Sequence, residues 1–98
     1  MKTVINSVAT YLPSRVVTND DLSKSIDTSH EWIFARTGIE KRHLVSDGEF
    51  ASDLGIIAAK KAIEQANFDP VNLDAIIVST TTSDRQFPSC GARIQGEL

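Results

Sequence analysis

The sequence lacks most features that mark membrane, nucleic-acid-binding or disulfide-stabilised proteins. Its 98 residues include one cysteine, Cys90, which excludes an intramolecular disulfide and is typical of a reducing compartment. No apolar run approaches the roughly 20 residues of a membrane helix, and no signal-peptide core follows the N-terminus. Ten basic and 13 acidic residues give a net charge of −3, without the clustered basic face that binds nucleic acid. We therefore expect a cytoplasmic protein with no nucleic-acid or membrane partner.

Motifs for metal, phosphate or nucleophile sites are also missing. There is no Gly-rich phosphate loop, no nucleophile elbow and no Cys/His cluster, so we expect no metal ion and no cofactor. His30 and His43 are interpreted as surface histidines. Cys90 opens a predicted helix whose dipole could activate a thiol, but a lone cysteine is more often a small core residue.

Strand and helix signals alternate along the chain, which predicts an α/β protein. Residues 4–11 and 39–45 have strand composition, and residues 75–80 form a continuous apolar run typical of a strand covered on both faces. Such a strand needs more neighbours than this chain offers, so the sequence is interpreted as part of a larger sheet. Helices or helical turns are predicted after the capping residues Asn19, Thr28, Ser46, Asp69 and Ser89, with Gly38 ending the second.

Trp32, the only tryptophan, stands one helical turn before Arg36. An aromatic ring and a guanidinium four residues apart share a helix face, and together they can stack on and neutralise a nucleotide-like ligand. The alternative is a core tryptophan covered by an arginine that reaches over it. The residues alone leave both interpretations open.

The order and spacing of several segments resemble β-ketoacyl-acyl-carrier-protein synthase III over essentially the whole chain. The most specific part is Asp-Thr-Ser-x-Glu-Trp-Ile at residues 27–33, followed by Arg-Thr-Gly-Ile at residues 36–39. Further segments that carry the resemblance are Tyr11-Leu12-Pro13, Val17-Thr18-Asn19, Arg42, Ser52-Asp53-Leu54, residues 79–82, Phe87-Pro88-Ser89 and Gln95.

The resemblance implies a thiolase fold, in which two similar halves each hold a mixed sheet between helices and the protein is a homodimer. Residues 1–98 would be the N-terminal part of the first half. It also implies a decarboxylating condensation of an acyl-CoA with malonyl-acyl carrier protein, at the start of type II fatty-acid synthesis. Coenzyme A would enter as a thioester substrate and not as a cofactor.

The resemblance also assigns roles to individual residues. Trp32 resembles the aromatic residue that stacks on the adenine of coenzyme A. Arg36 and Thr37 resemble residues that line the same entrance, and Thr28 resembles a neighbouring contact. Phe87 resembles the residue that reaches across the dimer to close the partner's acyl pocket, where a bulky ring favours short acyl primers.

Three departures from the family pattern bear on these expectations. His30 stands where an acid is common, and Ser7 and Ala9 replace the usual glycines of the first strand. The family's nucleophilic cysteine would lie beyond residue 98, and Cys90 is not at its position. We therefore expect no catalytic residue in this chain and no condensing activity from it alone.

Two alternatives remain open. The chain could be a non-catalytic interaction module that pairs with an intact synthase through the Phe87 loop. It could also belong to a related thiolase-superfamily enzyme that uses other acyl-CoA partners, such as an alkylquinolone or hydroxymethylglutaryl-CoA synthase. In either case we expect an oligomer in which Ile76, Ile77 and Val78 are buried, partly by another chain.

Overall fold

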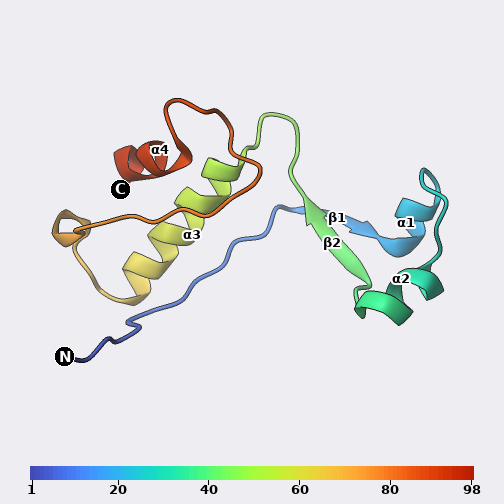
Figure 1. The fold of residues 1–98 in the computed structure, drawn as a ribbon, viewed down its shortest axis with the longest axis horizontal. Helices are drawn as coiled ribbons and strands as arrows, with labels where there is room; N and C mark the ends of the chain where they lie inside the picture. The colour runs from blue at the N-terminus through green and yellow to red at the C-terminus, as the bar shows by residue number, and fades with distance from the viewer. The chain divides into compact units, whose positions relative to one another are not determined.

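The computed structural model describes residues 1–98, which form four α-helices, one 3-10 turn and two strands (Figure 1). In chain order these are β1 (Arg15–Thr18), α1 (Asn19–Ser23), α2 (His30–Thr37), β2 (Lys41–Leu44), α3 (Ala51–Gln65), η1 (Pro70–Asn72) and α4 (Cys90–Glu97). The chain divides into two compact units. Unit 1 comprises Met1–Tyr11 and Gly48–Leu98, and unit 2 comprises Leu12–Asp47. No helix is both long and apolar enough to span a membrane.

Unit 2 is built on the antiparallel pair β1–β2, with α1 and α2 in the connection between the strands (Figure 1). The register places Arg15 opposite Leu44 and Thr18 opposite Lys41. The strand predicted over residues 39–45 is therefore confirmed in β2. β1 has no counterpart among the predicted strands, because four residues are too few to show an alternating pattern.

The start of α1 differs by one residue from the prediction. Thr18, and not Asn19, is the N-cap: the Thr18 hydroxyl accepts the Asp21 N–H, and the Asp21 carboxylate accepts the Thr18 N–H at 2.9 Å. This reciprocal pair is a capping box. The backbone hydrogen bond from Thr18 is the main cause that lowers the pKa of Asp21. Asn19 therefore does not cap α1, and its side chain is fully buried.

The residues that begin and end α2 can also be compared with the prediction. Ser29, and not Thr28, is the N-cap, with its hydroxyl accepting the Trp32 N–H at 3.1 Å. Both residues carry a hydroxyl suited to the role, so the sequence pattern does not choose between them. At the other end Gly38 has φ 68°, the left-handed conformation that ends the helix as predicted.

α3 in unit 1 begins later than predicted. Its first residue is Ala51, and the Asp53 carboxylate accepts the N–H of the preceding Phe50 at 2.8 Å. The predicted start at Ser46 is wrong because Gly48 has φ 80°, which a right-handed helix cannot include.

α3 and α4 pack against each other and form the small core of unit 1. Ile56 from α3 and both Cys90 and Ile94 from α4 are buried. Gly55 allows the close approach, since a Cβ added there would lie 2.8 Å from Ile94 Cδ1. A larger residue at position 55 would require the Ile94 side chain to shift.

The two remaining predicted caps are confirmed. The Asp69 carboxylate accepts the Val71 N–H at 3.0 Å and opens the short turn η1. The Ser89 hydroxyl accepts the Ala92 N–H at 3.1 Å and opens α4, which ends at Glu97. Each cap depends on contacts within three residues, which is why the sequence predicts them.

The strands predicted over residues 4–11 and 75–80 do not form. Neither segment pairs with another strand in the structure. In the single chain Ile77 is 94% exposed, Val78 is 39% exposed and Ile76 is half-buried, so their burial by another chain stays a prediction. The composition favours a strand, but a strand exists only when a neighbour pairs with it, and no segment of this chain does.

Candidate functional site

An exposed aromatic–cation pair lies on one face of α2. The guanidinium carbon of Arg36 stands 4.3 Å from the centroid of the Trp32 ring, within cation–π range. The Trp32 side chain is 55% exposed, so in this structure it is not a core residue. Arg36 lies in the last turn of α2, where a positive charge is favourable, and it forms no ion pair. Its charge and one face of the indole are therefore available to a ligand.

A shallow depression of about 570 Å³ adjoins the tryptophan. The residues that line it are Ile26, Asp27, Thr28, Ser29 and Trp32. Thr28 is half-buried, and the structure thus brings this predicted site residue to the same depression as Trp32. Arg36 is not among the lining residues, although it contacts Trp32.

Thr37 has a different local task. Its hydroxyl donates to the Ile33 carbonyl at 2.7 Å and accepts the Ile39 N–H at 3.0 Å. The side chain thereby helps to end α2 beside Gly38. Thr37, like Arg36, does not line the depression beside Trp32.

A fully buried amide, the side chain of Asn19, organises the residues around α2. Its Nδ2 donates to the Ile39 carbonyl at 2.7 Å and lies 3.1 Å from His30 Nδ1, and its Oδ1 accepts from the Arg42 guanidinium at 2.6 Å. Arg42 also donates to the Val17 carbonyl at 3.2 Å. Both histidines depart from the prediction: each is half-buried, and His43 Nδ1 bonds the Pro13 carbonyl at 2.6 Å.

A second polar cluster lies in unit 1 around Asp84. Its carboxylate accepts the Ser52 N–H at 3.0 Å and the Ser52 hydroxyl, and it pairs with Arg93 at 3.1 Å. Arg93 also donates to Ser52 Oγ and to Asp53 at 2.7 Å. Burial raises the pKa of Asp84, but the hydrogen bonds from Ser52 and Arg93 outweigh it and lower the pKa to about 2. The same carboxylates raise the pKa of Arg93.

Cys90 is the small buried residue that the sequence favours. Its side chain is 6% exposed, and its Sγ donates to Asp84 at 3.6 Å. Both histidines belong to unit 2, so unit 1 contains no imidazole that could take the thiol proton. The arrangement provides packing and not a nucleophile.

Phe87 lies on the loop between Asp84 and the Ser89 cap and is 89% exposed. The loop is attached at both ends, at Asp84 through hydrogen bonds to α3 and α4, and at Ser89 through the cap of α4. Phe87 is therefore a large apolar side chain held out from an anchored loop.

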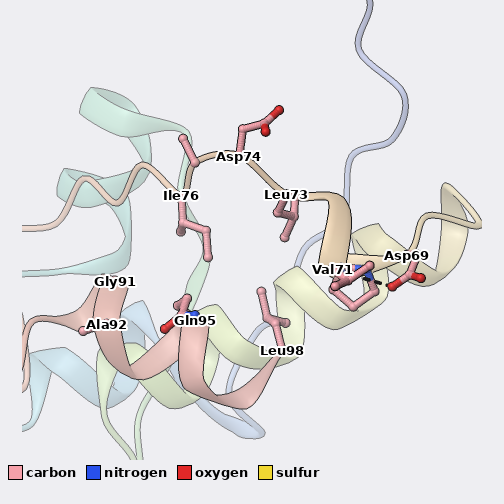
Figure 2. Close-up of a pocket in the computed structure, with 11 residues that line it drawn as sticks. Asp69, Val71, Leu73, Asp74, Ile76, Gly91, Ala92, Gln95 and Leu98 are labelled. Carbon is pink, nitrogen blue, oxygen red and sulfur yellow. Dashed lines mark hydrogen bonds between the residues drawn. The ribbon is translucent and has the colours of Figure 1, made fainter.

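A cavity of about 810 Å³ in unit 1 separates residues 69–76 from α4 (Figure 2). Figure 2 shows Gln95 and Leu98 facing Leu73 and Ile76 across it, while Asp74 points away. Asp69 at its margin is engaged in capping η1. No group able to perform acid–base or nucleophilic chemistry converges on this space, so it is not the candidate site.

Sequence comparison finds relatives along the whole chain. It is 49% identical over 98 residues to the β-ketoacyl-[acyl-carrier-protein] synthase III of Caulobacter vibrioides, which covers 100% of this chain and 30% of that protein. The chain thus spans about 30% of the length of the curated relatives it matches. No protein-family model matches the chain.

Structural comparison gives the same result. The 3-oxoacyl-[acyl-carrier-protein] synthase III of Aquifex aeolicus superposes with a TM-score of 0.89 and 42% identity, over 95% of this chain and 30% of that one. The priming β-ketosynthase of the R1128 polyketide pathway superposes with a TM-score of 0.88 and 34% identity, over 95% of this chain and 28% of that one. These likenesses confirm the predicted α/β class and the partial thiolase fold.

Proposed function

We propose that this chain, which belongs to the β-ketoacyl-[acyl-carrier-protein] synthase III family, forms part of the coenzyme A entrance of a condensing enzyme. The reaction is the decarboxylating condensation of an acyl-CoA with malonyl-acyl carrier protein that begins type II fatty-acid synthesis. The 49% identity to a curated synthase III over the whole chain supports this assignment. Its coenzyme A and carrier-protein substrates would place the reaction in the cytoplasm.

The single observation that carries the proposal is the exposed Trp32–Arg36 pair. One indole face meets the guanidinium at 4.3 Å, and the other is left for the adenine of coenzyme A. A stacked base contributes about 1–3 kcal/mol, whereas an exposed ion pair to a phosphate contributes about 0.2–1 kcal/mol. Stacking on Trp32 is therefore the larger contribution, and Arg36 adds charge complementarity to the phosphates.

The other predicted site residues have supporting roles in this proposal. Thr28, in the depression beside Trp32, presents a hydroxyl to the nucleotide. Thr37 acts at the outer edge of the entrance, with its hydroxyl committed to the end of α2. The catalytic cysteine and its partners belong to parts of the enzyme outside these 98 residues.

Phe87 is proposed to close the acyl pocket of a second subunit in a homodimer. Its 89% exposure and its anchored loop are the properties that such a role requires. A phenyl ring at the end of an acyl pocket leaves room only for a short chain, so the expected primers are short acyl-CoAs.

A related condensing activity is the second candidate. The R1128 priming β-ketosynthase, which acts in a polyketide pathway, is 34% identical to this chain. The Trp32–Arg36 pair suits coenzyme A in either case, because the nucleotide is common to all acyl-CoA primers. A non-catalytic interaction module remains the alternative if the Phe87 loop binds an intact synthase while Trp32 binds no nucleotide.

The proposal is tested by titrating coenzyme A into the 98-residue protein and following the fluorescence of its only tryptophan. Saturable quenching is expected, because adenine stacks on the ring that emits. Adenosine 3′,5′-bisphosphate should compete, and pantetheine, which lacks the base, should not. Equal quenching by pantetheine, or none at millimolar coenzyme A, would reject the site.

A further inference from the structure

One buried amide contacts both ends of α2. Asn19 Nδ2 donates to the carbonyl of Ile39, which follows the Gly38 that ends the helix, and also lies 3.1 Å from Nδ1 of His30, its first residue. The Asn19 N–H adds a bond of 3.0 Å to the Glu40 carbonyl. Because Asn19 is fully buried, water cannot replace these partners. α2 is therefore held at its beginning and just past its end by one side chain.

The hydrogen-bond partners fix which atom of each group donates. Arg42 can only donate, so Asn19 Oδ1 accepts from it at 2.6 Å. The Ile39 carbonyl can only accept, so the Asn19 nitrogen faces it and has one N–H left for His30. His30 Nδ1 must then be the acceptor, with the ring proton on Nε2. The amide thus connects α2 to Arg42 on β2, and through Arg42 to the Val17 carbonyl on β1.

His30 and Trp32 lie on opposite sides of α2. A helix turns about 100° per residue, so two residues place side chains about 200° apart. His30, which meets Asn19, stacks on Phe34 one turn later, with ring centroids 5.6 Å apart. Trp32 and Arg36 form the pair on the other side. Any rotation of the helix about its axis that releases His30 therefore also redirects Trp32.

We propose that His30 is a positioning residue: by accepting the Asn19 amide hydrogen it sets the rotation of α2 and so directs Trp32 and Arg36 toward the nucleotide. This inference rests on the proposed coenzyme A site. It also assigns a role to His30, which stands where an acid is common in the family pattern. The requirement is for an acceptor at the position of Nδ1 and not for a positive charge.

The test compares two variants of the 98-residue protein. His30→Ala removes the acceptor, whereas His30→Asn places an amide oxygen where Nδ1 was. Residual dipolar couplings of the α2 amides, fitted together with those of β1 and β2, measure the orientation of the helix within unit 2. Coenzyme A affinity is measured in parallel by Trp32 fluorescence. Lys24→Ala, an exposed change on the neighbouring segment, is the control.

For His30→Ala we expect α2 couplings that no longer fit the wild-type orientation and a dissociation constant for coenzyme A at least fivefold higher. His30→Asn and the control should keep both within twofold of wild type. Unchanged couplings in His30→Ala, or changed couplings with unchanged affinity, would overturn the proposal. Suppose that no version binds coenzyme A, but the α2 couplings change in His30→Ala and stay at the wild-type values in His30→Asn. The positioning of α2 by His30 is then upheld and the nucleotide site is rejected. Should His30→Ala lose the β1–β2 pairing, His30→Leu, which keeps side-chain bulk but has no acceptor, replaces it with the same expected results.

Discussion

Asp84 and Ser52 lie 32 residues apart in the sequence, and both the N–H and the hydroxyl of Ser52 donate to the Asp84 carboxylate. The contact attaches the loop that carries Phe87 to the first turn of α3. A carboxylate that accepts several hydrogen bonds is stabilised in its charged form, and the pKa of Asp84 accordingly falls to about 2 against the raising effect of burial.

The stability of unit 1 should therefore fall as pH drops from about 4 to about 2. A carboxyl whose folded-state pKa is lowered contributes stability above its unfolded value, 3.8, and loses it as pH falls through the folded value. Urea-unfolding midpoints across this range should fall steeply for wild type and less steeply for Asp84→Asn, which should also be less stable at neutral pH. Asp74→Asn, at an exposed carboxylate, should keep the wild-type slope; equal slopes for all three proteins would contradict the account.

Asn19→Ala should destabilise unit 2 by about 1–3 kcal/mol. The substitution leaves the Arg42 guanidinium and the Ile39 carbonyl without their buried partner, and an unsatisfied buried polar group costs this much. Denaturant unfolding followed by Trp32 fluorescence measures the change, with the exposed Asp20→Ala as its control. A difference below 0.5 kcal/mol between the two variants would mean that the Asn19 hydrogen bonds contribute little to the stability of unit 2.

Local signals account for the part of this structure that the sequence predicts. Gly38, Asp69 and Ser89 act through contacts within a few residues, so their roles follow from residue type and spacing. The capping errors at Thr18 and Ser29 are displacements by one position, because adjacent residues are both good capping types. The Trp32–Arg36 pair is likewise predictable, since it spans one helical turn.

The contacts that the sequence does not predict join residues that are far apart along the chain. Asn19 meets Arg42 across 23 residues, and Ser52 meets Asp84 across 32. No periodicity within one sequence connects such pairs. The apolar run at residues 75–80 shows the converse: its composition favours a covered strand, but pairing and burial depend on a neighbour that this chain does not provide.

The purified 98-residue protein should show no condensing activity with acetyl-CoA and malonyl-acyl carrier protein. Cys90 is buried against Asp84, and unit 1 offers no histidine to accept its proton. A radiochemical assay, with an intact synthase III as positive control, measures this directly. Turnover by the highly purified chain that disappears in Cys90→Ser would contradict the prediction.

The chain should associate in solution. Ile77 is 94% exposed and Phe87 89% exposed, and residues 75–80 have unpaired backbone groups that another chain can cover. Sedimentation velocity at low micromolar concentration should give a dimer or a larger species. Ile77→Asp should shift the distribution toward monomer. A compact species near 10.7 kDa with cooperative unfolding would be evidence against association.

The central claim, that Trp32 contributes to the coenzyme A entrance of a synthase III, is tested most directly in a chimera. This chain replaces the matched 98 residues of the Caulobacter vibrioides synthase, and kcat/KM for acetyl-CoA is measured for the chimera and its Trp32→Ala variant. The account predicts turnover by the chimera and a roughly five- to hundredfold lower kcat/KM for the variant, since a stacked base is worth about 1–3 kcal/mol. The melting temperature should barely change, because the ring is 55% exposed. A folded chimera without turnover, or a Trp32→Ala variant with unchanged kcat/KM and a sharply lower melting temperature, would contradict it.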